Sequence, residues 1–293
     1  MRNYLSLRDV SGRDLRLKKS LKNMKNNLVF KGLLFLTLIL VSTSCSEYQK
    51  LLKSNDNDLK YEKAMKYYED GDYMRAATLF SGLISIYRGT EKSETSHFIY
   101  AECLFKMKDY LMAGHYYNLF VQNYPNSEQS EEAQFQTAYC SYKLSPNPRL
   151  DQTETYKALE GFQLFINLYP NSEKAKEATV LMDELRDKLV FKSYLSAKLY
   201  YNLGDYMGNN YQSAVIAARN TLDDFPDTKY REELSFLILD AKYIEAVNSV
   251  EAKQEDRLRD TLDEYYSFVN EYPESIYLHN ANKIFEETSR LLK

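Results

Sequence analysis

Apolar and small residues recur at an interval of 37 residues in the first three of several similar segments of this chain, and within each segment they follow the three- and four-residue spacing of a helix. Two sets of positions coincide at this offset: the small residues Ala64, Ala101 and Ala138, and the aromatic residues Tyr68, Phe105 and Tyr142. The pattern predicts that one pair of helices is used several times.

Short segments with a proline separate these repeats. They begin at Tyr124, Tyr169, Phe225 and Tyr272, and each continues with Pro, one polar residue and then Ser or Thr. The residue before a proline is displaced from the α region, so each segment should end a helix. The polar residues, Asn126 or Ser127 in the first segment, can cap the next helix. Tyr87-Arg88-Gly89-Thr90 is expected to play the same part with Gly in place of Pro.

These boundaries predict five helix pairs followed by a closing helix. The pairs are expected at residues 58–90, 91–127, 128–172, 173–228 and 229–275, and the closing helix at 276–292. An eight-residue extension should begin at Ser145 between the helices of the third pair, and the fourth pair should have a longer first helix through Tyr201. The closing helix should cover the last apolar face, with Glu286, Glu287 and Arg290 on its outer side.

The repeats resemble tetratricopeptide repeats. The shared features are a small residue in the first helix, Gly71-Asp72-Tyr73 at the turn, an Ala followed four residues later by an aromatic residue, and the terminal Pro. The Trp of that consensus is absent, and Thr261 replaces the Ala of the fifth repeat. The resemblance implies an all-α fold, a superhelical tetratricopeptide-repeat solenoid of five helix pairs plus a C-terminal capping helix, with N-terminal repeats 1–3 at 58–172 and C-terminal repeats 4–5 and the capping helix at 173–293.

The front of the chain carries one apolar run, from Leu33 to Val41, preceded by Lys25 and Lys31. This run is too short to span a bilayer comfortably, but it suits the apolar region of a secretory signal peptide at 1–44. The alternatives are a buried helix or a retained membrane anchor, and the polar sequence that follows argues against both. Because signal peptides seldom have so long a leader, we hypothesise that residues 1–23 precede the true start at Met24.

The small residues that lead to Cys45 resemble the lipobox of bacterial lipoproteins, although Ser42 stands where an aliphatic residue is commoner. The resemblance implies that the chain is cleaved before Cys45, that Cys45 becomes the new N-terminus and carries covalent acyl chains such as palmitate, and that residues 45–57 form a tether. Buried acyl chains contribute about 0.8 kcal/mol per methylene to membrane binding. The Ser that follows Cys45 resembles the outer-membrane case of lipoprotein sorting.

Charge and the scattered reactive residues exclude several classes of function. From Cys45 onward the chain has 29 Lys and Arg against 40 Asp and Glu, a net charge of −11, which argues against binding nucleic acid. The three His residues are far apart, and neither a nucleophile elbow nor a Gly-rich phosphate loop occurs. We therefore expect no enzyme, no metal and no cofactor beyond the lipid. Cys103 and Cys140 are expected to be small buried residues without a disulfide.

An aromatic stripe is predicted along the first helices of repeats one to three, about 60° to 100° round from the small residues. Its members are Tyr61, Met65, Tyr68, Phe98, Glu102, Phe105, Phe135, Tyr139 and Tyr142, edged by Lys106 and Lys143. Such a stripe would suit an extended peptide ending in an aromatic residue, with a lysine near its carboxylate. The alternative is that these rings only pack between helices, because a one-residue error in register turns the stripe by 100°.

Two segments are similar to the BamD family, the lipoproteins of the outer-membrane β-barrel assembly machine: CSEYQKLLKS at Cys45 and KYEKAMKYYEDGDYMRAATLF at Lys60. The resemblance implies a lipid-anchored scaffold on the periplasmic face of the outer membrane. In that family the N-terminal repeats receive the C-terminal peptides of unfolded outer-membrane protein clients. The C-terminal repeats dock the periplasmic domains of the barrel subunit BamA.

Two other kinds of protein remain as alternatives. One is another envelope tetratricopeptide adaptor, linked to cell division or peptidoglycan, which typically has a coiled coil ahead of fewer repeats; no heptad run precedes Lys60. The other is a lipid-anchored glycan-binding protein, which is much longer and binds sugars through inserted loops with Trp. This chain has no Trp.

Overall fold

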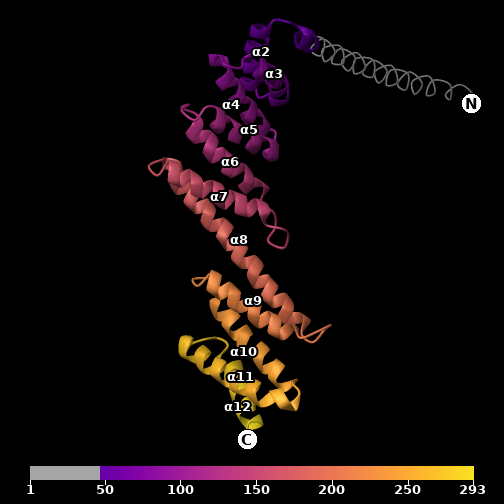
Figure 1. Ribbon diagram of the computed structural model, residues 1–293, viewed down its shortest axis with the longest axis vertical. Helices are drawn as coiled ribbons and strands as arrows, with labels where there is room; N and C mark the ends of the chain where they lie inside the picture. Colours follow the sequence, from indigo (N-terminus) through magenta and orange to yellow (C-terminus); the bar gives the residue numbers. More distant parts are fainter. Residues whose placement is uncertain (1–46) are drawn as a thin grey trace, which may run out of the picture. The chain divides into compact units, whose positions relative to one another are not determined.

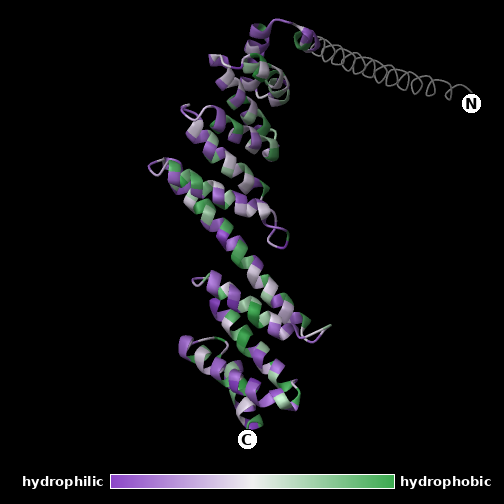
Figure 2. Ribbon diagram, in the orientation of Figure 1, coloured by the Kyte–Doolittle hydropathy of each residue, from purple (hydrophilic) through white to green (hydrophobic). Residues whose placement is uncertain are grey.

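The computed structural model describes residues 47–293, and every regular element in this part of the chain is a helix (Figure 1). The predicted signal peptide at 1–44, Met24 and Cys45 lie outside the described residues. Figure 2 shows hydrophilic and hydrophobic residues mixed along the helices. Within residues 47–293, none of the helices has the length and apolar character needed to cross a membrane. The predicted all-α repeat fold is confirmed.

The described chain forms two compact units, which divide after Cys103. The first unit contains a helical segment at 47–53, α2 (Asn57–Glu69), α3 (Tyr73–Ile86) and most of α4 (Glu91–Lys106). Its core is formed by α2 and α3 with Cys103 of α4 packed against them. The largest buried side chains there are Phe80 and Leu83.

The segment expected to be a tether is helical in part. Tyr48, Leu51 and Leu52 of the 47–53 helix pack against the core of the first unit. The Tyr48 ring meets the Tyr67 ring edge-on, with 5.8 Å between centres, and the Arg75 guanidinium lies 5.2 Å from the centre of the Tyr48 ring. Residues 47–53 therefore belong to the folded body, because burying their apolar side chains is favourable.

The second unit is a sequential stack of helices joined to the end of α4. The helices are α5 (Tyr110–Asn123), α6 (Ser130–Leu144), α7 (Thr153–Leu168), α8 (Glu173–Leu203), α9 (Asn210–Asp224), α10 (Arg231–Val247), α11 (Glu251–Glu271) and α12 (Leu278–Leu291). Consecutive helices from α5 to α12 contact each other, and so do α6 with α8, α8 with α10, and α10 with α12. The first helix of each of these pairs thus touches the first helix of the next, as expected of stacked repeats.

The predicted helix ends at the prolines are confirmed. α5, α7, α9 and α11 end at Asn123, Leu168, Asp224 and Glu271, each directly before the aromatic residue that precedes Pro. The same turn follows in all four places: the N–H of the Ser or Thr donates to the aromatic residue's carbonyl at 3.1 to 3.2 Å. The hydroxyl of that Ser or Thr then accepts an N–H two residues further on, at 3.0 to 3.2 Å.

The expected capping role holds for one of these hydroxyls and is wrong for Ser127. Ser172 is the N-cap of α8 and accepts from the N–H of Lys174. Ser127 instead closes a turn, and α6 begins only at Ser130, after Gln129, whose side chain makes no capping bond. The same three-residue interval separates Thr228 from the start of α10 and Ser275 from the start of α12, so direct capping occurs only at Ser172 among these four turns.

The turns inside the pairs use a different cap. Asp72, Asp109 and Asn209 each accept an N–H three residues later at the start of the second helix. The residue before the first two caps has a left-handed conformation, with φ of 79° at Gly71 and 65° at Lys108. The Gly-Asp-Tyr pattern therefore reflects a backbone requirement that Gly meets at lower cost than Lys.

The irregular repeats also follow the prediction. Residues 145–152 form an eight-residue extension between α6 and α7, and α8 is 31 residues long. The closing helix α12 buries Ala281, Ile284 and Thr288. One detail differs from the expectation: Glu287 is half-buried because its carboxylate accepts a hydrogen bond from Tyr243 of α10.

Small residues let the helices approach closely. Ala64, Ala101 and Ala138 are at most 2% exposed, and Thr261 of the fifth pair is fully buried. A Cβ atom added to Gly161 of α7 would lie 2.9 Å from the Cβ and 3.2 Å from the Cα of Ala138 in α6. Such separations are shorter than normal contacts, so the spacing of α6 and α7 depends on the absence of a side chain at Gly161.

We expect Gly161→Ala to destabilise the protein by about 1 to 3 kcal/mol, because the added methyl group overpacks the α6–α7 contact. The matched control is Gly82→Ala, since a Cβ at Gly82 of α3 meets nothing within 4 Å. That change should stabilise by up to about 1 kcal/mol through helix propensity. Thermal unfolding followed by circular dichroism measures both. Equal effects at the two glycines would contradict the close approach.

Candidate peptide-binding surface

Five members of the aromatic stripe lie in the first unit and are half-buried: Tyr61, Met65, Tyr68, Phe98 and Glu102. The Tyr61 ring meets the rings of Phe80 and Tyr87 edge-on, with centres 6.0 and 5.8 Å apart. Met65 packs against the same core. These side chains thus combine core packing on one side with partial exposure on the other.

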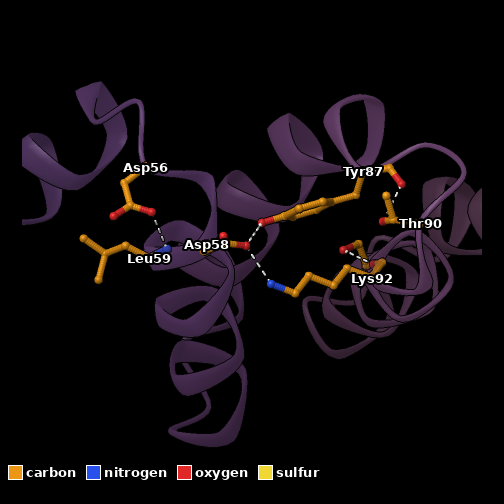
Figure 3. A network of polar contacts seen from close by, with 7 residues as sticks. Asp56, Asp58, Leu59, Tyr87, Thr90 and Lys92 are labelled. Carbon is orange, nitrogen blue, oxygen red and sulfur yellow. Dashed lines mark hydrogen bonds and ion pairs between the residues drawn. The ribbon is translucent and has the colours of Figure 1, made fainter.

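A polar cluster joins the start of α2 to the turn after α3 (Figure 3). The Asp58 carboxylate accepts from the Tyr87 hydroxyl at 3.0 Å and from Lys92 Nζ at 2.6 Å. Lys92 Nζ also lies 5.0 Å from the centre of the Tyr61 ring. The hydrogen bond with Lys92 is the largest cause that lowers the pKa of Asp58, followed by the bond with Tyr87. Sequence reasoning missed this cluster, whose members lie outside the stripe.

Tyr68 and Glu102, both predicted members of the stripe, are brought together. The Tyr68 hydroxyl donates to the Glu102 carboxylate at 3.4 Å, which links α2 to α4. Burial raises the pKa of Tyr68 to about 12, with a further contribution from the charge of Glu102. The hydroxyl therefore remains a donor throughout the physiological range.

The stripe members in the second unit form a stack of rings. Phe105 packs on Tyr139, Tyr139 stacks on both Phe135 and Tyr142, and the ring centres are 5.6 to 6.0 Å apart. Phe135 is only 2% exposed and also contacts Phe162 of α7. This corrects the expectation that Phe135 lines a groove: it is a core residue, and the half-buried Phe105, Tyr139 and Tyr142 form the accessible part of the stack.

The two lysines at the edge of the stripe are exposed in the last turns of α4 and α6. Lys143 Nζ lies 4.7 Å from the centre of the Tyr139 ring and 5.6 Å from that of Tyr142. A hydrogen bond with the Tyr139 side chain is the largest cause that raises the pKa of Lys143. A positive charge therefore lies over the accessible rings, while Lys106 makes no ring contact of this kind within residues 47–293.

Tyrosine hydroxyls and carboxylates join the first helices of successive repeats. The bonds run from Tyr142 to Glu184 (2.7 Å), from Tyr194 to Glu233 (2.8 Å), from Tyr201 to Asp240 and from Tyr243 to Glu287. Tyr68 with Glu102 makes the same kind of bond in the first unit. Phe105 has no hydroxyl and contacts the Tyr139 ring instead. Sequence reasoning included Glu102 in the stripe but did not predict the carboxylate partners of the other tyrosines, although an acidic residue one repeat after each tyrosine was the available signal.

The described residues of this surface supply neither a metal-ligand cluster nor an exposed cysteine. Within residues 47–293, no group of three or more His, Cys, Asp or Glu side chains could hold a metal ion. Cys103 and Cys140 are buried, as expected, and burial raises the pKa of Cys103 to about 12, so its reactive thiolate is suppressed. What the stripe offers a ligand is half-buried rings and a cation.

Stacked helix pairs of this kind define a helical-repeat protein. A comparison with protein families identifies the particular family: the model of YfiO, described as outer membrane lipoprotein, matches residues 53–241. The chain belongs to this family, which is the family of BamD, and it is accordingly an outer-membrane lipoprotein. No curated protein matches the chain.

We expect Tyr201→Phe to cost about 1 kcal/mol of stability, because it leaves the half-buried Asp240 carboxylate without its donor. The matched control is Tyr206→Phe, since Tyr206 is 68% exposed in the loop after α8, and that change should have little effect. Combining Tyr201→Phe with Asp240→Asn in a double-mutant cycle should give a coupling above about 0.5 kcal/mol. Additive effects in thermal unfolding would argue against the bond.

The tyrosine–carboxylate bonds also predict sensitivity to alkali. The pKa values of Tyr68, Tyr142 and Tyr243 are raised to about 12 from the ordinary 10. A raised pKa means that the folded state favours the protonated hydroxyl, so this stabilisation is complete below pH 10 and is lost as the pH rises towards 12. We expect the melting temperature to fall over that window. The triple Phe variant should show a shallower fall, and an equal slope would contradict the prediction.

Proposed function

We propose that this chain is a periplasmic scaffold of the outer-membrane β-barrel assembly machine, anchored by a lipid on Cys45 and without catalytic activity. The observation that carries the proposal is the family match, which spans residues 53–241 and thus covers helices of both units. The net charge of −11 from Cys45 onward also favours polypeptide partners over nucleic acid.

The first three repeats are the proposed site for client peptides. Rings that are half-buried, such as Tyr139 and Tyr142, can contact an apolar C-terminal side chain without a large ordering cost. Lys143, held over these rings, can pair with the terminal carboxylate. Because Phe135 is in the core, the proposed contact surface excludes it.

The last two repeats are the proposed docking site for the periplasmic domains of a BamA-like barrel subunit. Exposed apolar side chains on α9 and α11 and before α12 support this assignment: Ile216, Tyr266 and Ile276 are 53%, 50% and 84% exposed. Aromatic and aliphatic side chains of this kind are typical anchors of protein interfaces.

Affinity purification of the full-length protein from detergent-solubilised membranes tests the scaffold function. We expect the BamA-like barrel subunit to co-purify, and Cys45→Ala to lower the membrane-bound fraction because the acyl chains are lost. Recovery of division proteins or peptidoglycan fragments without the barrel subunit would favour the envelope adaptor instead.

Site-specific crosslinking tests the client site. A photoreactive phenylalanine analogue in place of Lys143 should crosslink to an unfolded outer-membrane protein that ends in Phe, because Lys143 lies at the accessible rings. The matched position is Lys176, an exposed residue of α8 outside the stripe. Equal crosslinking at both positions would exclude the stripe as the client site.

A further inference from the structure

The eight-residue extension before α7 is an ordered part of the second unit that the proposed function does not use. The buried side chain of Gln152 donates to the carbonyls of Asn147 and Leu150 at 2.9 and 3.1 Å. From α8, Lys188 Nζ donates to Ser145 Oγ at 2.6 Å and Lys192 Nζ to the carbonyl of Leu150 at 2.7 Å. The bonds of Gln152 therefore hold the extension in shape, and the two lysines attach it to α8.

A cleft of about 500 Å³ lies between this extension and α8. Pro148 and Arg149 form one wall, and Leu195 and Leu199 contribute apolar surface from α8, with Leu199 57% exposed. A smaller cleft of about 290 Å³ lies next to it and shares Lys192 and Ser196 with it. Together the two clefts offer room for an extended chain that crosses α8.

The larger cleft is positively charged in a chain that is otherwise acidic. Arg149 is exposed, and its guanidinium has no ion pair among residues 47–293. Lys192 donates to the carbonyls of Pro148 and Leu150, which carry no charge. Lys198 is paired with Glu233 at 2.8 Å. The pKa of Asp151 is lowered mainly by its hydrogen bonds with Thr153, and the positive charge of Lys192 makes a smaller contribution.

We propose that this cleft binds an internal acidic segment of a partner polypeptide, one that alternates carboxylates with bulky apolar side chains. One carboxylate pairs with Arg149 beside Lys192, and an apolar side chain packs on Leu195 and Leu199. A chain with a net charge of −11 from Cys45 onward repels acidic partners elsewhere, so a local cationic cleft selects where they bind.

The donors that remain free favour a carboxylate over a phosphate group. Two of the three N–H bonds of Lys192 are used on carbonyls, and Lys198 serves Glu233. The planar guanidinium of Arg149 is left, and its fork matches one carboxylate. The apolar floor beside it suits a side chain rather than a lipid headgroup. The residues that line this cleft do not belong to the aromatic stripe, and the site requires no terminal carboxylate.

Fluorescence anisotropy with the full-length protein tests the proposal. The probe is a fluorescein-labelled, C-terminally amidated peptide of sequence Gly-Leu-Glu-Phe-Glu-Leu-Gly, so no terminal carboxylate is present. We expect Arg149→Gln to raise its Kd about tenfold, the equivalent of one carboxylate pair. Leu199→Ser should raise it about threefold. Both side chains are exposed, so folding is preserved. Lys176→Gln removes one positive charge from α8 outside the cleft, so it is the charge-matched control and should leave Kd unchanged.

Further probes define the outcomes that overturn the proposal. The same peptide with Gln in place of both Glu residues should bind about tenfold more weakly. Added salt should weaken the binding of the acidic peptide, because it screens the charges. Vesicles of phosphatidylglycerol separate the lipid alternative: loss of vesicle binding in Arg149→Gln with unchanged peptide binding would assign the cleft to a membrane. Absence of peptide binding by the unmodified protein at millimolar concentration would also contradict the proposal.

Discussion

Close packing of helices at small residues is the constraint on which the rest of this structure depends. A single helix pair cannot bury its apolar face alone, so each pair needs the next one against it. Ala138 and Gly161 bring α6 and α7 within contact of their backbones, and the larger rings then fill the space around them. Tyrosine hydroxyls that emerge from this packing reach a carboxylate on the following first helix. The same stacked helices thus supply both the close packing and the tyrosine–carboxylate hydrogen bonds.

Local signals in the sequence predicted most of the fold. Proline and the residue before it restrict the backbone by themselves, so the ends of α5, α7, α9 and α11 could be placed without knowing what they pack against. The start of α6 could not, because the identical segment Tyr-Pro-Asn-Ser and the same turn bonds precede α8, which begins directly after Ser172. The helical packing of Tyr48 was also missed, because its partner Arg75 lies in a distant part of the chain.

The candidate site was predictable as a set of residues but not as a surface. The predicted stripe residues lie on α2, α4 and α6, yet the rotation of α6 decides that Phe135 faces the core while Tyr139 and Tyr142 stay accessible. The sequence alone could not supply that angle. The cationic cleft was harder to predict, because Arg149 and Lys192 are 43 residues apart in the sequence and come together only when the extension folds onto α8. The family match supports the proposed scaffold function, and the geometry of the extension and α8 supports the proposed binding cleft.

The long helix α8 has a mechanical consequence. Its 31 residues serve the third and the fourth repeat without a break, so it spans roughly 46 Å at the helical rise. α7 packs along it and so does α9. The third and fourth repeats are thus connected through one unbroken helix, and backbone geometry sets the distance between the places where α7 and α9 pack on it. A partner that contacted both repeats would need two contact points at a matching interval.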